Sequence, residues 1–153
     1  HILLSGEIIT GRDAVHKRLY EMITSGKPLP FDIKNQTIYY TGPCPKSGGA
    51  VIGSCGPTTS GRVDVFTPLL LEKGLKGMIG KGPRSIEVIN SIKQNNAVYF
   101  AAIGGAGALY SRHVKSAEVL CFEELLSEAV FRLYIEDFPV IAATDCCGGN
   151  IFD

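Results

Sequence analysis

The stretch "SCGPTTSGRVD", residues 54–64, places two threonines, a serine and an arginine within a frame of Gly56, Pro57 and Gly61. Such a run is too polar and too rich in turn-forming residues for a buried core. The segments on either side, "AVIG" before it and "VFTPLLLEKG" after it, are apolar enough to be buried. We therefore expect a surface loop between buried elements, and the question is which ligand this loop binds.

The length of the chain predicts one domain spanning residues 1–153. A chain of this size buries roughly 70% of the surface that it exposes when unfolded, which is enough for a substantial core. Apolar strand-like segments alternate with helical patterns along the sequence. This alternation is typical of the α/β class and predicts a largely parallel or mixed sheet covered by helices.

Apolar spacing and turn-forming residues define the expected elements. We expect helices over residues 10–26, 62–73 and 83–96, and strands within residues 36–42, 50–54, 75–82, 97–109, 117–122 and 129–145. In the first helix, Thr10 and Asp13 form an N-terminal capping pattern. Pro68 either kinks the second helix or marks its first turn, Pro83 opens the third, and Pro139 divides or breaks the last strand region.

The charge of the chain argues against a global attraction to polyanions. With 15 basic and 15 acidic residues the formal net charge is zero, so neither nucleic acid nor an anionic membrane is an expected partner. No apolar run reaches the roughly 20 residues of a membrane helix, and the N-terminus lacks the pattern of a signal peptide. We therefore expect a cytoplasmic protein in which any anion site is local.

The cysteines and histidines do not form a metal-binding pattern. There are five cysteines and no C-x-x-C pair, which favours reduced thiols over disulfides or a zinc site. Cys44 and Cys55 lie near the polar loop and could neighbour a site. His16 and His113 lack partners at the spacing of a metal motif. We expect no metal site formed by this chain alone.

Three of the six arginines occur where a helix is expected to begin. Arg12 follows "TG", Arg62 follows "TTSG", and Arg84 follows "KGP", with Lys81 just before it. A basic residue there is normally unfavourable, because a helix N-terminus carries roughly half a positive charge. Each arginine alone could be a solvated surface residue. Three such positions after glycine loops favour a carboxylate or phosphate site gathered from several helix ends.

Five blocks of the sequence resemble a known enzyme family. The blocks are "SGEIITGRDAVHKRL", "YYTGPCP", "IGSCGPTTSGRVD", "GKGPRS" and "DCCGGNIF". In this order they are similar to the β subunit, or C-terminal domain, of iron-sulfur hydro-lyases of the class I fumarase and L-tartrate dehydratase type. The resemblance covers nearly all of the chain. It implies a swivelling β/β/α domain whose active site forms where it closes onto an α subunit or N-terminal domain.

The resemblance also implies a cofactor and a reaction. The partner α subunit would carry a [4Fe-4S] cluster on three cysteines, and this chain would bind no metal by itself. The reaction would be the reversible addition of water to a dicarboxylate, fumarate to L-malate. L-tartrate or a methyl-substituted fumarate are alternative substrates. A stand-alone regulatory domain that binds a dicarboxylate or phosphate metabolite is the alternative from another class.

The family motif assigns roles to individual residues of the polar loop. Thr58 is the expected proton-transfer residue, and the resemblance places an acidic partner for it in the other subunit. Such a partner is needed because a threonine hydroxyl moves a proton only when it is activated. Arg12 and Arg62 are expected to bind the substrate carboxylates, and Lys81 is a further cationic contact.

The resemblance extends to the residues around these four. Gly56 and Thr59 complete the expected substrate-binding loop, and Arg84 is an additional anion contact. Pro83 departs from the family pattern, which leaves the detailed shape of its loop open. The adjacent cysteines at 146–147 lie outside the cluster-ligand pattern and receive no role.

Partner contacts are expected on a glycine-rich or apolar face. We expect the α subunit to dock around "GPCP", residues 42–45, and "GGAGA", residues 104–108. The β chains are also expected to associate with one another, within an α2β2 assembly or as β-β pairs.

Overall fold

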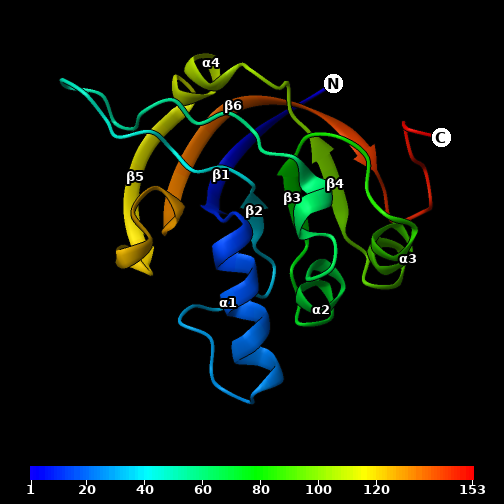
Figure 1. Cartoon of the computed structure of the whole chain (residues 1–153). Helices are drawn as coiled ribbons and strands as arrows, with labels where there is room; N and C mark the ends of the chain where they lie inside the picture. Colours follow the sequence, from blue (N-terminus) through cyan, green and yellow to red (C-terminus); the bar gives the residue numbers. More distant parts are fainter.

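The sheet of the protein closes on itself. A computed structural model describes all residues 1–153. Because β1 pairs with both β2 and β6, five strands form a ring, and β5 continues the sheet beyond β6 (Figure 1). The strands are β1 (Ile2–Thr10), β2 (Thr37–Tyr39), β3 (Gly77–Gly80), β4 (Val98–Ala101), β5 (Val114–Cys121) and β6 (Val130–Thr144). The helices are α1 (Asp13–Thr24), α2 (Thr67–Glu72), α3 (Ile86–Gln94) and α4 (Gly107–Ser111), with 3-10 helices η1 (Ser60–Val63) and η2 (Glu123–Glu128).

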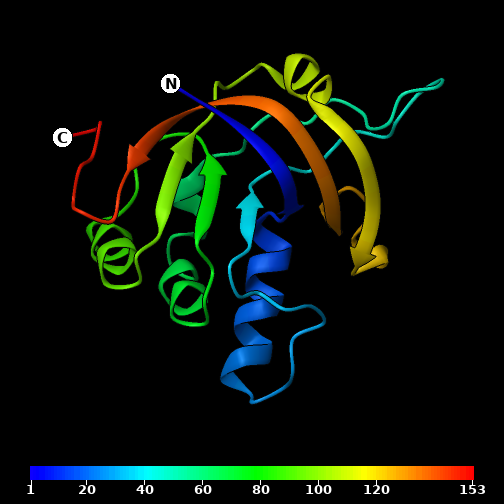
Figure 2. The same cartoon turned by 180° about the vertical axis from the view of Figure 1, so that it is seen from behind.

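The sheet is mixed, which confirms the predicted class. Strands β1 to β4 pair in parallel with one another, whereas β6 runs antiparallel to β1, β4 and β5. Helices α1, α2 and α3 lie on one side of the molecule, and α4 lies at the opposite end (Figures 1 and 2). No helix is long and apolar enough to cross a lipid bilayer. The closure of the sheet into a ring is a feature that the sequence pattern does not predict.

Alternating strand residues face two separate cores. Tyr40 and Met78 belong to the core that packs against α1, α2 and α3. Their chain neighbours Tyr39 and Ile79 belong to a second core, which includes Tyr110 of α4. All five side chains are almost completely buried. This alternation is the period of two expected of strands that are covered on both faces.

The predicted N-terminal cap of α1 is wrong. The helix begins after Arg12, whose backbone is extended. Thr10 ends β1 instead, where its hydroxyl donates to the carbonyl of Ala129 (3.3 Å) and accepts from the backbone N of Phe131 (3.0 Å). The Thr10 hydroxyl therefore bonds to the backbone at the start of β6 and does not cap the helix, because a buried polar group requires a partner.

Two other helix boundaries differ from the prediction. The helix expected over residues 62–73 divides into η1 and α2, and Pro68 lies in the first turn of α2, one of the two places expected for it. Helix α3 begins later than predicted. Ser85 is its N-cap and accepts from the backbone N of Val88 (3.2 Å), so Pro83 lies in the preceding loop.

The strand predictions fail where long-range contacts decide the structure. Residues 50–54 form no strand, and this part of the chain folds back so that Cys44 N donates to Ser54 O (2.8 Å). Strand β1 is missing from the predicted elements because its order comes from pairing with the distant β6. Strand β6 runs unbroken through Pro139, whose carbonyl accepts from the hydroxyl of Tyr110 (2.9 Å).

His16 is a fully buried side chain on α1. Its Nδ1 donates to the carbonyl oxygen of Arg12 (2.7 Å), and its ring meets the ring of Tyr40 edge-on, with 5.2 Å between centroids. Burial lowers the pKa of His16 from 6.5 to about 4. The folded protein therefore holds this ring neutral.

We predict that His16 makes the fold acid-sensitive between pH 6.5 and about 4. An unfolded histidine binds a proton near pH 6.5 and the folded one only near 4, so its contribution is fully present above pH 6.5. It should fall by up to about 3 kcal/mol as the pH drops through this window. His16→Asn keeps a donor for the carbonyl of Arg12, and denaturant unfolding at several pH values should show a flatter profile for this variant. His113→Asn is the control and should retain the wild-type slope. An unchanged slope in His16→Asn would contradict the assignment.

Candidate active site

The chain from Thr58 to Ser60 lies between the ends of β2 and β3. Thr58 donates to the carbonyl oxygen of Tyr40 from its backbone N (2.8 Å) and from its hydroxyl (3.1 Å). On the other side, Lys81 N donates to Thr58 O (3.2 Å), and Ser60 N donates to Lys81 O (2.9 Å). The loop therefore lies at the carboxyl ends of the parallel strands, the end at which parallel α/β sheets commonly bind their ligands, whether open or closed into a barrel.

The preceding part of the loop is held by side chains at the end of β2 and just after it. The hydroxyl of Thr41 donates to Gly56 O (2.8 Å), and the hydroxyl of Tyr39 donates to Cys55 O (2.5 Å). Gly107 of α4 accepts from Cys55 N (3.2 Å) and packs so closely that a Cβ on it would lie 2.9 Å from Gly56 N. The backbone at Gly56, a predicted substrate contact, is thus held from two sides.

Arg12 joins this edge from the start of α1. Its side chain packs on Gly42, just past β2, where an added Cβ would lie 2.8 Å from the Arg12 Cδ and 3.0 Å from its Nη1. The Nε of Arg12 is buried and has no hydrogen-bond partner in the protein. Leaving a buried donor unpaired costs roughly 1–3 kcal/mol. The protein itself therefore leaves one donor of this guanidinium unsatisfied.

Three of the remaining predicted contacts are accessible to solvent. Arg62 and Thr59 are exposed, and Lys81 is half-buried. The stem of Lys81 runs past Gly104, where an added Cβ would lie 3.2 Å from the lysine Cδ. None of the ion pairs in the protein involves Arg12, Arg62 or Lys81. These three cations are therefore free to meet an external anion.

The helix-end argument describes Arg12 but neither of the other two arginines. Arg12 is the N-cap of α1, whereas Arg62 lies within the four residues of η1 and Arg84 precedes the N-cap of α3. A macrodipole of useful size needs a longer run of aligned peptide units than η1 provides. The case for Arg62 as an anion ligand therefore rests on its exposure beside Thr59 and on the family motif.

Arg84 is placed differently from the other predicted anion contacts. Its side chain has no exposed surface, and its Nε donates to the Oδ1 of Asp64 (2.7 Å). Burial alone would lower the pKa of Arg84, yet Tyr40 and the Asp64 carboxylate shift it upward. This placement gives no support to a direct contact with substrate. Asp64, the partner of Arg84, has no predicted role. The signal for it in the sequence is its position as the acidic end of the "TTSGRVD" motif.

Thr58 has the geometry of an oriented hydroxyl. Its Oγ1 proton points to the carbonyl of Tyr40, so its lone pairs are directed away from the backbone. The Tyr40 carbonyl also accepts from the backbone N of Thr58 (2.8 Å) and remains paired if the hydroxyl turns toward a ligand. The hydroxyl can therefore turn and hydrogen-bond to a ligand without leaving the Tyr40 carbonyl unsatisfied.

The chain offers no ligand set for an iron-sulfur cluster. No group of three or more His, Cys, Asp or Glu side chains comes together in a way that could hold a metal ion. Cys55 is buried, Cys121 is half-buried, and Cys44 and the adjacent pair at 146–147 are exposed. These residues do not fit the cluster that the resemblance implies, so no chemical step is assigned to a cluster on this chain.

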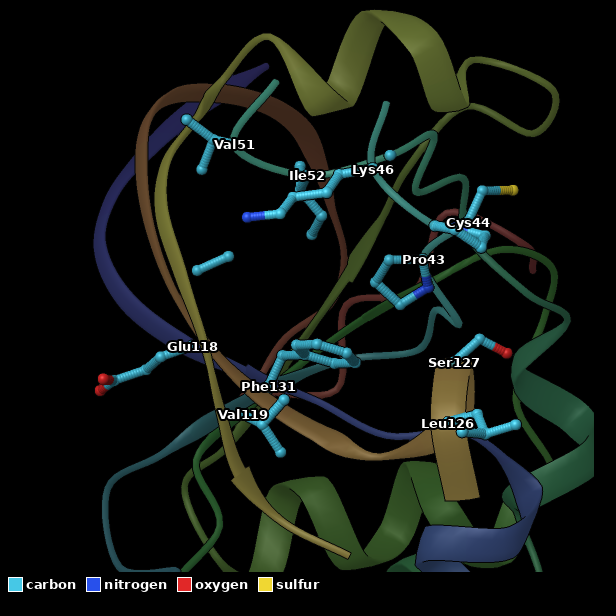
Figure 3. A pocket seen from close by; sticks show the side chains of 13 residues that line it. Pro43, Cys44, Lys46, Val51, Ile52, Glu118, Val119, Leu126, Ser127 and Phe131 are labelled. Carbon is cyan, nitrogen blue, oxygen red and sulfur yellow. The ribbon is translucent and has the colours of Figure 1, made fainter. Parts of the chain in front are cut away.

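The part of the sheet edge that carries Arg12, Arg62 and Lys81 is called the cation edge below. A separate pocket of about 380 Å³ begins next to it. It lies between the loop after β2 and the β5–β6 pair, and Figure 3 shows Pro43, Ile52 and Phe131 among the apolar side chains around it. Glu118 reaches away from it toward solvent (Figure 3). The predicted site residues do not line this pocket, although Pro43 follows Gly42, the residue on which Arg12 packs.

Comparison with known proteins identifies the family. Residues 1–153 match the family described as "Fumarase C-terminus". The chain belongs to this family. The match covers every residue that positions the cation edge, from Arg12 on α1 to Lys81 after β3.

The relatives of this chain are named as fumarate hydratases or as a tartrate dehydratase subunit. The chain is 40% identical to the anaerobic class I fumarate hydratase of Escherichia coli K12 over 151 residues, which is 97% of this chain and 28% of the relative. It is 38% identical to the mitochondrial fumarate hydratase 1 of Leishmania major, again over 28% of that protein. It is 36% identical to a Methanocaldococcus jannaschii protein named as a candidate subunit beta of L(+)-tartrate dehydratase, covering 99% of this chain and 81% of the relative. The chain thus spans little more than a quarter of the fumarate hydratases.

We predict that none of the five cysteines ligates a cluster. Changing Cys44, Cys121, Cys146 and Cys147 to serine, and the buried Cys55 to alanine, should leave the iron content of the complex with its partner unchanged, as measured by iron and sulfide analysis. Stability should fall by about 1 kcal/mol, mainly from the small cavity at Cys55. Stoichiometric loss of iron when Cys44 or Cys55 alone is changed would show that the cluster is held by this chain.

Proposed function

We propose that this chain is the β component of an iron-sulfur hydro-lyase that reversibly hydrates fumarate to L-malate. Its part would be to bind the substrate carboxylates with Arg12, Arg62 and Lys81 and to move a proton with Thr58. The observation that carries the proposal is the unpartnered, buried Nε of Arg12, which lies at the same sheet edge as the joined Thr58 and Lys81 backbones. The family and the names of the relatives support the reaction class.

The carboxylates of the substrate would be divided among the cations. Arginine can bind a carboxylate with two parallel hydrogen bonds, whereas lysine acts as a point charge. Arg12 and Lys81 approach from α1 and from the end of β3, on either side of the chain that carries Thr58. A dicarboxylate held at both ends would present one of the two carbons between its carboxyl groups to the Thr58 hydroxyl. Gly56 and Thr59 would line the loop beneath it.

The threonine would need a second group to complete proton transfer. A threonine hydroxyl is a weak base, so an acidic residue must take up or return its proton. We propose that this residue comes from a partner α subunit or N-terminal region, onto which the present domain closes by a swivelling movement. That partner would also hold the [4Fe-4S] cluster, which would supply Lewis-acid assistance to the hydration.

The docking of the partner is expected at an apolar or glycine-rich face around residues 42–45 and 104–108. Around residues 104–108, Ile103 and Leu109 are exposed apolar side chains, and Val51 and Leu126 are exposed beside residues 42–45. Exposed apolar groups next to a ligand edge support an interface there. Association of β chains with one another, and a cytoplasmic location, remain predictions from the sequence.

L-tartrate and a methyl-substituted fumarate are the alternative substrates. The relative from Methanocaldococcus jannaschii favours L-tartrate, because its name is that of a dehydratase subunit and it is aligned over most of its length. A hydroxyl or methyl group is distinguished by the walls of the pocket, some of which the partner would supply. A stand-alone regulatory domain that binds a dicarboxylate would use the same cations but would need no proton-transfer residue.

We predict that the isolated chain folds but has no hydratase activity. The two buried cores suffice for a fold, whereas the acid and the cluster are expected on the partner. Circular dichroism should show a folded chain, and absorbance at the fumarate band should show turnover only after assembly with the anaerobically loaded partner. Fumarate, L-malate, L-tartrate and methylfumarate would be compared in the same assay. Turnover by the isolated, metal-free chain would overturn the proposal.

We predict that Arg62 and Thr58 affect different kinetic constants. Arg62→Met removes a charge-assisted pair and should cost about 2–5 kcal/mol of transition-state stabilisation, part of it as weaker substrate binding. Thr58→Val keeps the shape and should lower kcat about a hundredfold or more with little change in affinity. Thr59→Val tests the register of the motif: Thr59 lines the proposed binding loop and makes no side-chain hydrogen bond at the cap of η1, so its change should affect binding and leave kcat nearly unchanged. A loss of kcat at Thr59 without a loss at Thr58 would mean that the motif has been aligned one residue out of register.

A further inference from the structure

We propose that Arg84 and Asp64 are positioning residues, which lock the two cation-bearing loops together and keep Arg62 free for the substrate. Arg84 belongs to the segment that begins with Lys81, and Asp64 follows Arg62 by two residues. The effect on catalysis rests on the proposed function, whereas the effect on the loops does not.

Asp64 uses both carboxylate oxygens to bind the segment after Lys81. Its Oδ1 accepts from the Nε of Arg84 and its Oδ2 accepts from the backbone N of Ser85, each at 2.7 Å. The side chain of Asp64 is 13% exposed and that of Arg84 is 0% exposed. A buried pair of this kind is strongly sensitive to loss of either partner, because the remaining charge is left without compensation.

The guanidinium of Arg84 is enclosed on all sides. It lies 4.7 Å from the ring centroid of Tyr99 and 5.3 Å from that of Tyr40. One Nη donates to the hydroxyl of Thr67 (3.1 Å), and the other contacts the sulfur of Met78 (3.6 Å). Since Tyr40 and Met78 belong to the core beneath α1–α3, the ion pair anchors both loops to the rigid part of the domain.

A second connection runs parallel to the ion pair. The hydroxyl of Tyr99 donates to Gly82 O (2.7 Å) and lies 2.7 Å from the Oγ of Ser60. Because the Tyr99 proton goes to Gly82, the Ser60 hydroxyl must be the donor in the other bond. Arg62 therefore lies between two tethered residues, Ser60 and Asp64. Its backbone has little freedom although its side chain is exposed.

The ion pair also removes a competitor for Arg62. An unpaired carboxylate at position 64, only two residues away, could attract the Arg62 guanidinium and compete with a substrate carboxylate. In the structure this charge is committed to Arg84, and Arg62 forms no ion pair. Thr58 is held separately, through the carbonyl of Tyr40. Breaking the pair should therefore weaken substrate binding more than it slows proton transfer.

The test compares variants of this chain in the complex with its cluster-bearing partner. Arg84→Met removes the charge and keeps an apolar stem, Arg84→Lys keeps the charge without the planar fork, and Asp64→Asn removes the competing carboxylate at nearly constant shape. The double variant combines Arg84→Met with Asp64→Asn. The matched control is Arg132→Met, which breaks the exposed pair with Glu118 on the β5–β6 ribbon.

Positioning predicts a characteristic split between the kinetic constants. In Arg84→Met the KM for the dicarboxylate should rise about tenfold or more while kcat falls less than about threefold. Adding Asp64→Asn should return part of the lost affinity, and Arg84→Lys should be intermediate. Arg132→Met should match the wild type. A role in folding alone would instead lower the active fraction, and with it the apparent kcat, at unchanged KM.

Hydrogen exchange supplies a readout that does not depend on turnover. The amides of Ser60 and Lys81, which link the two loops, should exchange about tenfold faster in Arg84→Met, while the amide of Met78 within β3 keeps its protection. If Arg84→Met does not fold, Arg84→Lys and Asp64→Asn decide the matter by the same measurements. A KM within about twofold of wild type together with unchanged exchange at Ser60 and Lys81 would overturn the proposal. If the wild-type complex hydrates no dicarboxylate, the proposed function fails, and the exchange rates alone still decide the positioning role.

Discussion

The parallel pairing of β2 with β3 ends at the hydrogen bond from Tyr40 N to Ile79 O (2.8 Å), and the candidate site depends on what happens beyond it. Past this bond, the loop at 58–60 lies between the segments that follow β2 and β3. It pairs with backbone N–H and C=O groups that these two segments no longer pair with each other. Tyr40 supplies the acceptor on one side, and Lys81 supplies a donor and an acceptor on the other. Parallel strands twist apart at their ends, which creates room for such an insertion. The proton-transfer candidate and a cation thereby become neighbours through backbone bonds alone.

Glycines at the ends of these strands allow the insertion. At Gly80, the last residue of β3, an added Cβ would meet the Oγ of Ser60 and would lie 2.6 Å from the ring of Tyr40. At Gly42, past β2, it would press into the side chain of Arg12. The absence of side chains at both positions lets the loop and the arginine approach the sheet edge closely. The same closeness buries the Tyr99 hydroxyl, which is matched by the carbonyl of Gly82 and the Oγ of Ser60.

The sequence predicts the elements of the site better than their environment. The resemblance places Thr58, Arg12 and Lys81 in one site, and the structure does bring the backbones of Thr58 and Lys81 together. The class and the mixed sheet follow from alternating patterns. The burial of Arg84 cannot be predicted in this way, since "GKGPRS" is a polar, turn-rich segment whose arginine is buried only because Asp64 and two tyrosine rings meet it from elsewhere in the chain. The prediction that Thr10 caps α1 is wrong for the same reason, because the hydrogen-bond partners of Thr10 lie more than a hundred residues away in the sequence.

Arg84 and the other predicted cations differ in how their charge is compensated. A buried cation must be matched within its own fold, and Arg84 is matched by Asp64. Arg12 has a buried donor that nothing in the chain satisfies, and Arg62 and Lys81 form no ion pairs. Charge is therefore compensated where it supports the loops and left uncompensated where a ligand would bind. In the proposed function, this packing would hold the uncompensated cations ready for a dicarboxylate. The proposed proton transfer would also need an acid to work with the Thr58 hydroxyl, and the proposal assigns that acid to the partner.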